Sequence, residues 1–266
     1  MVEGADERLI AFAERLADAA GSAVRPHFRA AAEAHNKAGA GDPFDPVTVA
    51  DRAAEAAMRR LIATYYPDHK VYGEEEGGAL SDDHPTWVLD PIDGTRAFIL
   101  GLPMWGTLIA LDLGSGPVLG IMDQPFTGER FIGHDGSAQF IHGGQKRRLS
   151  TRRCGELGAA MLAATSPDMF TAPEEQKGFS ALKAKVRLTR FGCDCYAYAM
   201  LAMGLIDLVV EANMRPFDIQ ALIPIIEGAG GMVTTWTGES ARHGGRILAS
   251  GDPKMHAAAL TILNAA

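Results

Sequence analysis

The segment 87–95 constrains this chain more than any other part of its sequence. It reads Trp-Val-Leu-Asp-Pro-Ile-Asp-Gly-Thr, an apolar and β-prone run that ends in the carboxylate of Asp90. Pro91 is expected to stop the strand there, because proline cannot donate to a sheet ladder. Asp93 follows three positions after the first acid, and Gly94 closes a turn whose backbone N–H groups can point outward. Two acids beside such amides predict a site for a hard divalent cation and a phosphate.

The composition of the chain excludes several classes of protein. Its 266 residues are 47% hydrophobic and 22% charged, as in an ordinary globular protein. Basic residues number 25 and acidic residues 33, and the resulting net charge of −8 opposes binding to nucleic acid or to an anionic membrane. The three cysteines argue against a disulfide framework. Because no apolar run reaches the ~18 residues of a membrane span and the acidic N-terminus lacks signal-peptide features, we expect a cytoplasmic protein.

Helical and strand patterns are interleaved along the chain. Helical spacing of apolar residues covers 5–20, and a capping pattern from Thr48 to Asp51 opens a second helix that runs to about Tyr65. Short strands are expected at 70–72, 86–90, 105–112, 117–122, 129–133, 159–164, 186–190 and 206–211. A polar loop is expected at 166–177, followed by a helix. Further helices are expected at 194–203, from Asp218 to Gly228 or Gly230, and from 253 onward. This alternation predicts an α/β layered sandwich.

A segment rich in glycine and basic residues, 136–150, divides the sandwich into two closely packed lobes. We place an N-terminal α+β lobe at 1–140 and a C-terminal α/β lobe at 141–266. The first lobe carries the segment 87–95, and the second carries Asp218. We expect the two lobes to fold as one unit rather than as independent domains.

Two further acids lie where an element is expected to begin or end. Glu74 follows the short strand at 70–72 and Gly73, and Asp218 stands at the start of a helix after Pro216 and Phe217. Taken alone, Glu74 would belong to a solvated acidic turn, and Asp218 would be a helix N-cap. Together with the segment 87–95, they supply the additional carboxylates that a metal site needs.

Four short motifs occur in the order in which one known family has them. They are Pro46-Val47-Thr48-x-x-Asp51, Gly73-Glu74-Glu75, the segment 87–95, and Phe217-Asp218 followed by Glu227, Ala229, Gly230 and Gly231. With these motifs, the chain resembles the magnesium-dependent, lithium-sensitive phosphatases typified by inositol monophosphatase. The resemblance implies an alternating αβαβα sandwich, a homodimer and a small phosphate ester as the substrate.

The resemblance also implies a role for each matched acid. Glu74 and Asp90, with the backbone carbonyl of Ile92, would hold a first Mg²⁺. Asp90, Asp93 and Asp218 would hold a second Mg²⁺, and Glu74 would help to hold a third ion through water. Two ions can activate a water molecule on one side and neutralise the leaving oxygen on the other.

The remaining catalytic roles fall on two segments. Asp51 and Thr95 would orient and deprotonate the attacking water and would form the catalytic set together with Glu74. The amides of Gly94 and Thr95 would hold the phosphate. No protein nucleophile is needed, because phosphoryl transfer depends mainly on positioning and charge neutralisation. Lys37, upstream of these motifs, is a further candidate near the metal site and the substrate.

The segment 191–199 bears on the substrate. It reads Phe-Gly-Cys-Asp-Cys-Tyr-Ala-Tyr-Ala, where inositol-phosphate enzymes have the neutral Gly-Ser-Ala-Ala-Leu. Asp194 therefore opens a helix at the substrate position, and Glu211 matches a position that contacts the substrate in the family. Two acids suit a positively charged amino alcohol. With the segments 101–108 and 123–130, this pattern resembles the histidinol-phosphate phosphatase branch; the alternative is that Asp194 only caps its helix.

The sequence therefore predicts Mg²⁺-dependent hydrolysis of L-histidinol phosphate, a reaction of histidine biosynthesis. An inositol-1-phosphate phosphatase or a broad sugar-phosphate phosphatase is the alternative within the same class. An inactive protein that binds a phosphorylated metabolite is the alternative from another class. The sequence has neither the Gly-x-x-x-x-Gly-Lys-Ser/Thr phosphate loop nor the Gly-x-Ser-x-Gly nucleophile elbow.

Overall fold

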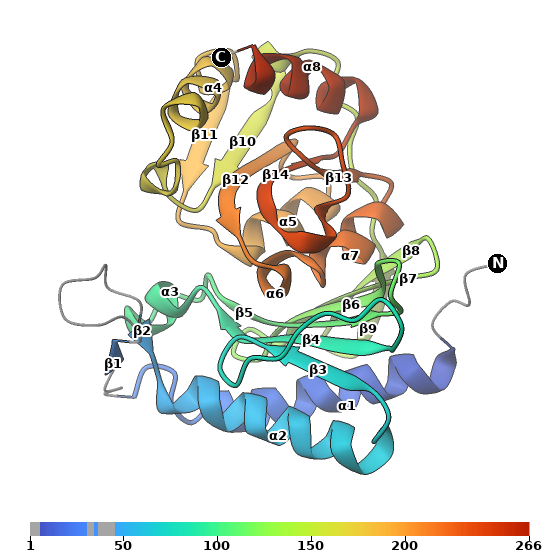
Figure 1. Ribbon diagram of the computed structural model, residues 1–266. Coiled ribbons are helices and arrows are strands. Elements are labelled where there is room, and N and C mark those ends of the chain that lie inside the picture. Colours follow the sequence, from blue (N-terminus) through green and yellow to red (C-terminus); the bar gives the residue numbers. More distant parts are fainter. Residues whose placement is uncertain (1–5, 31–34, 37–45, 266) are drawn as a thin grey trace.

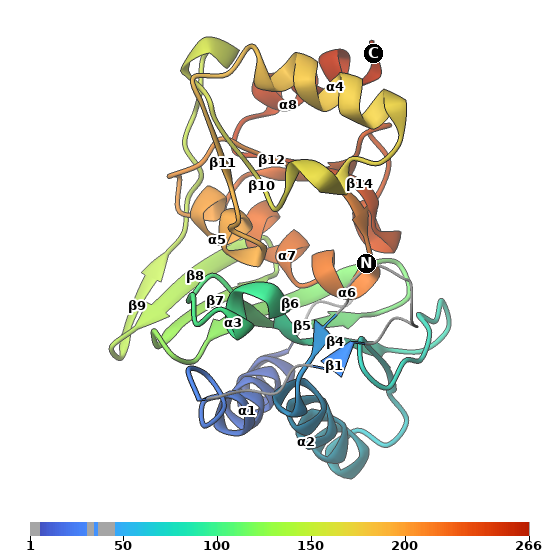
Figure 2. The ribbon, with the colours of Figure 1, turned by 90° about the vertical axis from the view of Figure 1, so that its left-hand side faces the viewer.

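Two β-sheets alternate with three layers of helices in this molecule (Figure 1). The computed structural model describes residues 6–30, 35–36 and 46–265. Helices lie outside each sheet, and a third group lies between the sheets, as Figure 2 shows from the side. The predicted αβαβα sandwich is confirmed.

The larger sheet has seven strands, which lie side by side in sequence order. Its first two strands pair in parallel and all later neighbours pair antiparallel. The strands are β3 (Lys70–Gly73), β4 (Thr86–Asp93), β5 (Gly106–Asp112), β6 (Pro117–Gln124), β7 (Glu129–His134), β8 (Ser137–His142) and β9 (Gln145–Arg148). Short strands β1 (His35–Asn36) and β2 (Pro46–Val47) pair separately.

The smaller sheet has five strands in the order β11-β10-β12-β14-β13. Its parallel half contains β10, β11 and β12, and β14 joins β12 and β13 antiparallel. The strands are β10 (Met161–Ala164), β11 (Leu188–Phe191), β12 (Leu208–Met214), β13 (Met232–Thr235) and β14 (Gly245–Ser250).

The helices form the three remaining layers (Figures 1 and 2). The layer outside the larger sheet contains α1 (Glu7–Val24) and α2 (Val49–Tyr65). The layer between the sheets contains α5 (Cys195–Ala202), α6 (Pro216–Ile219) and α7 (Leu222–Gly228). The layer outside the smaller sheet contains α4 (Pro173–Lys183) and α8 (Pro253–Asn264), and the short α3 (Thr95–Ile99) follows β4. None of the helices in the described part of the chain has the length and apolar character that crossing a membrane requires.

Each interface between layers has its own apolar core. The core between the sheets joins Val88 and Leu108 of the larger sheet to Val209 of the smaller one, with α5 and α7 packed between them. The core under α1 and α2 includes Trp87 and Leu89. Successive residues of β4 thus enter opposite cores, as the alternation of side chains along a strand requires.

Three elements differ from the sequence-based expectation. The segment 136–150 contributes β8 and β9 to the larger sheet, so this sheet extends to Arg148, beyond the predicted division at residue 140. The single helix expected from Asp218 is two helices, α6 and α7, separated at 220–221. The long polar loop predicted after Ser166 is shorter, because α4 begins at Pro173.

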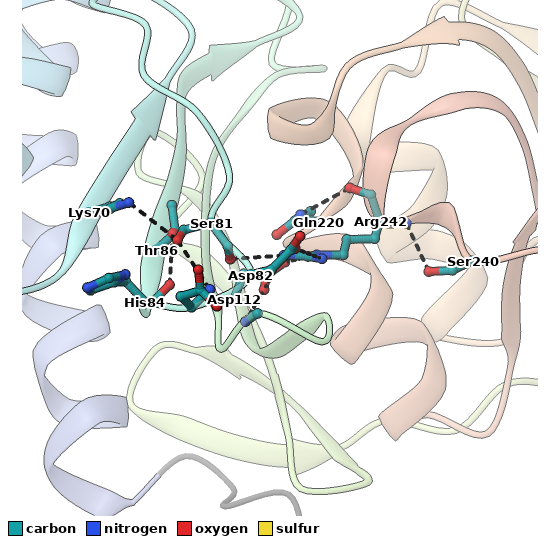
Figure 3. A network of polar contacts seen from close by, with 11 residues as sticks. Lys70, Ser81, Asp82, His84, Thr86, Asp112, Gln220, Ser240 and Arg242 are labelled. Atoms are coloured by element: carbon teal, nitrogen blue, oxygen red, sulfur yellow. Dashed lines mark hydrogen bonds and ion pairs between the residues drawn. The ribbon is translucent and has the colours of Figure 1, made fainter.

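A buried arginine joins the C-terminal half of the chain to the larger sheet (Figure 3). Arg242 lies in a short 3₁₀ helix before β14 and donates from Nε to Oδ2 of Asp112, at the end of β5, over 2.8 Å. Its two Nη atoms donate to Oδ1 of Asp82 (2.7 Å) and to the carbonyl of Ser81 (3.2 Å). The side chain of Arg242 is 9% exposed and that of Asp112 is fully buried. This pair therefore fixes the C-terminal half against the end of the larger sheet.

Replacing Arg242 with methionine should destabilise the protein by about 3–5 kcal/mol, because the buried carboxylate of Asp112 loses its partner. The matched control is Asp82→Asn, whose side chain is 81% exposed, so its loss should cost at most about 1 kcal/mol. Urea unfolding of both variants measures the difference. Equal free energies of unfolding for the two variants would show that the buried pair does not hold the lobes together.

Candidate active site

A β-bulge brings Asp90 and Asp93 to the same side of the larger sheet. Asp90 pairs with Leu108 of β5 and Asp93 pairs with Gly106, so three steps along β4 oppose two steps along β5. In a regular strand, residues three positions apart face opposite sides. The extra residue in the bulge removes this difference. Ile92 packs with the core under α1 and α2, as the shifted alternation requires.

The bulge corrects the predicted end of this strand. The strand was expected to stop at Asp90, yet β4 continues through Pro91 to Asp93. A bulge tolerates proline because the ladder is already interrupted there. The carbonyl of Pro91 accepts a hydrogen bond of 2.8 Å from Oγ1 of Thr107 on β5, which ties the bulge to its neighbouring strand.

A tight turn follows the bulge. Gly94 has φ of 91°, and a Cβ there would lie 2.8 Å from the carbonyl oxygen of Met104, so the turn requires glycine. Helix α3 begins at Thr95, whose Oγ1 donates to the carbonyl of Ile92 over 3.1 Å. The role of the Gly94 and Thr95 amides in holding phosphate stays a prediction.

Helix α6 carries the third acid to the same place. Asp90, Asp93 and Asp218 each offer a carboxylate oxygen, and these atoms all lie within 4.8 Å of one another. Asp218 is the third residue of α6 rather than its first, and its Oδ2 accepts a hydrogen bond of 2.6 Å from the amide of Arg215. It thus caps the helix from within and also faces the other two acids.

Burial and repulsion make this cluster costly without a cation. Burial raises the pKa of Asp90 and Asp93 well above the usual range, and neighbouring carboxylates add to the rise. Burial, together with the charge of Glu74, raises the pKa of Asp218 to about 8, although the amide of Arg215 opposes the shift. A divalent cation would compensate both the burial of these carboxylates and the repulsion between them. Carboxylate oxygens are hard ligands, which suit Mg²⁺. The residues present therefore fit the metal that the sequence predicts.

Glu74 joins this cluster from the neighbouring strand. It directly follows β3, and its amide donates to the carbonyl of Leu89 over 3.1 Å, so it lies beside the residue that precedes Asp90. Its charge raises the pKa of both Asp90 and Asp218. The structure thus brings together all four acids that the sequence singled out. Their division between two or three ions stays a prediction.

Asp51 lies at the start of α2, as the capping pattern predicted. Its Oδ2 accepts hydrogen bonds from the amide (2.8 Å) and the hydroxyl of Thr48, and Oγ1 of Thr48 accepts in return from the amides of Ala50 and Asp51. The Asp51 side chain is fully buried. The predicted pairing of Asp51 with Thr95 around a water molecule stays a prediction. Lys37 lies outside the described residues.

A cavity of about 190 Å³ opens beside the carboxylate cluster. We call it the acidic pocket because four carboxylates line it, those of Asp93, Asp194, Glu211 and Asp218. Its other lining residues are Thr165, Met169, Cys195, Tyr198, Ala212, Asn213 and Met214. The pocket lies where β12 and the start of α5 meet the metal cluster.

Asp194 occupies the N-cap position of α5 without capping it. Its side chain makes no capping hydrogen bond, and its φ is 44°, a value that residues with a side chain rarely adopt. Burial raises its pKa to about 6, against the opposing charge of Arg96. The alternative that Asp194 only caps the helix is therefore wrong, and its backbone strain is typical of a functional position.

Glu211 lies on β12 and is held by three donors. The amide and Oγ1 of Thr165 donate to its Oε1 over 2.9 and 2.5 Å, and the hydroxyl of Tyr198 donates to its Oε2 over 2.9 Å. Burial raises its pKa to about 7, although these hydrogen bonds oppose the shift. Both acids predicted to select the substrate thus line one pocket.

Sequence reasoning missed the residues that fix these acids in place. The amide of Cys195 donates to Oδ2 of Asp93 over 2.7 Å, which joins α5 to the bulge. Thr165 and Tyr198 act on Glu211 as described above. A backbone donor leaves no signal in the sequence, whereas Tyr198 lies within the segment that already marked the substrate site.

Comparison with known proteins identifies the family. The sequence description of the inositol monophosphatase family matches residues 5–266. The chain belongs to the inositol monophosphatase family. It is 42% identical over 268 residues to the chloroplastic bifunctional phosphatase IMPL2 of Arabidopsis thaliana, covering 97% of this chain and 75% of that one. It is 34% identical to the histidinol-phosphatase of Mycobacterium tuberculosis, covering 83% of this chain and 85% of that one.

Solved structures agree with the fold. An inositol monophosphatase from Zymomonas mobilis superposes with a TM-score of 0.84 at 40% identity, over 98% of this chain and all of that one. This protein is thus a phosphatase of the inositol monophosphatase family that acts on a small phosphate ester. The family is generally magnesium-dependent, which agrees with the chemistry of the carboxylate cluster.

The raised pKa of Asp218 makes the stability of the metal-free protein depend on pH. The folded state keeps a proton up to about pH 8, whereas an unfolded aspartate loses it near pH 4. The stability contributed by this proton is therefore present below pH 4 and is lost as the pH rises to about 8. Asp218→Asn removes this loss of stability at high pH, because asparagine does not ionise.

In EDTA, we expect Asp218→Asn to melt a few degrees above the unsubstituted protein at pH 8, at roughly 2–4 °C per kcal/mol, with a smaller gap at pH 5. Mg²⁺ should reverse the order by stabilising the unsubstituted protein more. Thermal unfolding at the two pH values measures both effects. A gap that does not change with pH would contradict the raised pKa.

Proposed function

We propose that this phosphatase hydrolyses L-histidinol phosphate to L-histidinol and phosphate with Mg²⁺ as its cofactor. The observation that carries the proposal is the acidic pocket beside the carboxylate cluster. Glu74, Asp90, Asp93 and Asp218, with the carbonyl of Ile92, would hold two or three ions. Bound Mg²⁺ supplies Lewis acidity and lowers the pKa of a coordinated water.

The residues around the cluster would position the other reactants. Thr48 fixes Oδ2 of Asp51 at the start of α2. The carboxylate of Asp51 is thus held in one position, from which it would accept a proton from the attacking water. Thr95, at the start of α3, would orient the same water. The amides of Gly94 and Thr95 would hold the phosphate, and the requirement for glycine at the turn keeps the backbone open to it.

The acidic pocket supports a cationic leaving group. Histidinol carries an ammonium and an imidazole, whereas inositol carries only hydroxyl groups. Asp194 is half-buried, lines the acidic pocket and makes no capping bond, so its carboxylate can pair with the ammonium. Glu211 would accept a further hydrogen bond from the substrate, because its position is fixed by Thr165 and Tyr198. A neutral polyol offers no positive charge to Asp194, which disfavours it as the leaving group.

The named relatives support this substrate and keep one alternative open. Three histidinol-phosphatases match at 33–34% identity, against 28–30% for three plant inositol monophosphatases. The Zymomonas mobilis protein, at 40%, is described as an inositol monophosphatase, so inositol 1-phosphate is the second candidate substrate. The convergence of all four acids argues against an inactive binding protein. We also propose a cytoplasmic homodimer, as the family resemblance implies.

Phosphate release from L-histidinol phosphate and from inositol 1-phosphate, each with Mg²⁺ and with EDTA, tests the proposal. With Mg²⁺, we expect a much higher kcat/KM for L-histidinol phosphate than for inositol 1-phosphate. With EDTA, we expect no turnover of either ester. A higher kcat/KM for inositol 1-phosphate would move the assignment to the alternative. Failure to release phosphate from any ester would favour a binding protein.

In the same assay, Asp194→Asn should raise the KM for L-histidinol phosphate by about tenfold to a hundredfold, because a hydrogen bond to a charged group is worth about 1.5–3 kcal/mol. The KM for inositol 1-phosphate should change little. The control is Asp252→Asn, since Asp252 caps α8 through the amides of Lys254 and Met255, outside the acidic pocket. Equal losses on both esters would show that Asp194 does not select the substrate.

A further inference from the structure

We propose that Glu55 of α2 is a positioning residue for the metal ligand Glu74. The inference rests on the metal site of the proposed function. Neither Glu55 nor its partner Arg59 belongs to the carboxylate cluster or lines the acidic pocket. Both belong to α2 and contact the turn that carries Glu74.

The turn at 73–77 is closed by its own backbone and held by Glu55. The amide of Gly73 donates to the carbonyl of Gly77 over 3.0 Å. The fully buried carboxylate of Glu55 accepts from the amides of the two residues that follow the ligand, Glu75 (2.8 Å, to Oε2) and Glu76 (3.0 Å, to Oε1). Hydrogen bonds from backbone amides to a carboxylate are stronger than hydrogen bonds between neutral groups, so these two fix the turn firmly.

Arg59 completes the clamp from one turn further along α2. Its Nε donates to Oε1 of Glu55 over 2.7 Å, and its Nη2 donates to the carbonyl of Gly77 over 2.6 Å. The pair thus holds the middle and the end of the turn together. The cation also compensates a carboxylate that would otherwise be buried without a counter-charge.

The close approach of α2 explains the glycine before the ligand. A Cβ on Gly73 would lie 2.2 Å from Oε1 of Glu55, so a side chain there would displace the Glu55 carboxylate from the turn. The amide of Glu74 is held on its other side by the carbonyl of Leu89 on β4. The ligand therefore lies between two fixed supports, with β4 setting its distance from Asp90 and α2 setting the path of the chain after it.

The same helix face carries the predicted base. Asp51 and Glu55 are four residues apart on α2 and lie on the same side of the helix. A single rigid element thus supports the residue predicted to receive a proton and the turn that carries a metal ligand. Groups that orient metal ligands typically contribute 10–100-fold to metal affinity.

The test measures Mn²⁺ affinity by electron paramagnetic resonance on the metal-free protein, independently of turnover. Glu55→Gln should weaken Mn²⁺ binding about tenfold or more. Glu175→Gln is the matched control, because Glu175 is also buried and also accepts from two consecutive amides, those of Thr171 and Ala172 (3.0 and 3.1 Å), at the start of α4. The control should lose stability and keep its Mn²⁺ affinity.

A second variant keeps the test decisive if Glu55→Gln does not fold. Arg59→Met leaves the buried carboxylate and its two amide bonds in place, and it should weaken Mn²⁺ binding in the same direction by a smaller factor. In both variants, excess metal should restore most of kcat, because neither side chain lines the acidic pocket or belongs to the metal cluster.

The outcomes separate this inference from the proposed function. If the unsubstituted protein binds Mn²⁺ and both variants bind it as tightly as Glu175→Gln does, Glu55 does not position the ligand. If the variants bind metal weakly but excess metal restores no activity, Glu55 acts on the reaction by another route and the inference also fails. If the unsubstituted protein binds no Mn²⁺, the metal site itself is wrong and the inference falls with it.

Discussion

The convergence of three aspartates, one buried and two half-buried, with carboxylate oxygens within 4.8 Å of one another, is the constraint on which the rest of this structure depends. Carboxylates in such a place repel one another and lose their hydration, and both effects raise their pKa. Three separate devices hold them there. The bulge in β4 brings Asp90 and Asp93 to one side, the N-terminal turn of α6 brings Asp218, and the amide of Cys195 fixes Asp93. A divalent cation offsets the repulsion that these devices impose.

The elements that hold the three aspartates belong to different layers, so the carboxylate cluster depends on how the layers pack. β4 and Glu74 come from the larger sheet, whereas α5 and α6 lie in the layer between the sheets. The core between the sheets and the buried pair of Arg242 and Asp112 fix the positions of these layers relative to one another. The acidic pocket likewise combines Asp93 of the larger sheet with Glu211 of the smaller one. The proposed metal site and the two acids proposed to select the substrate thus both lie where the two sheets face each other.

Local signals in the sequence predicted much of this arrangement. The capping box at Thr48 and Asp51 formed as predicted, because it depends on residues three positions apart. Short β-prone runs bounded by turn residues located most strands. The interleaving of helices and strands predicted a layered α/β sandwich, and the family resemblance supplied the αβαβα order of its layers.

The parts that escaped prediction depend on contacts between distant segments. Pro91 was expected to end the strand, because a rule for one residue cannot anticipate a bulge that β5 supports through Thr107. The backbone strain at Asp194 and the clamp of Glu55 on the turn at 73–77 arise only when separate elements meet. The family resemblance located the acids of the carboxylate cluster, but not the groups that hold them in place.

The release of protons on Mg²⁺ binding tests most directly whether Asp90, Asp93 and Asp218 form a metal site. Isothermal titration calorimetry at pH 7, in buffers of different ionisation enthalpy, counts the protons displaced by the metal. Because Asp218 has a pKa of about 8 in the metal-free protein, Mg²⁺ should displace about one proton or more at pH 7 and fewer above pH 8. Mg²⁺ binding without proton release at pH 7, or no Mg²⁺ binding, would contradict the claim that these carboxylates form a metal site.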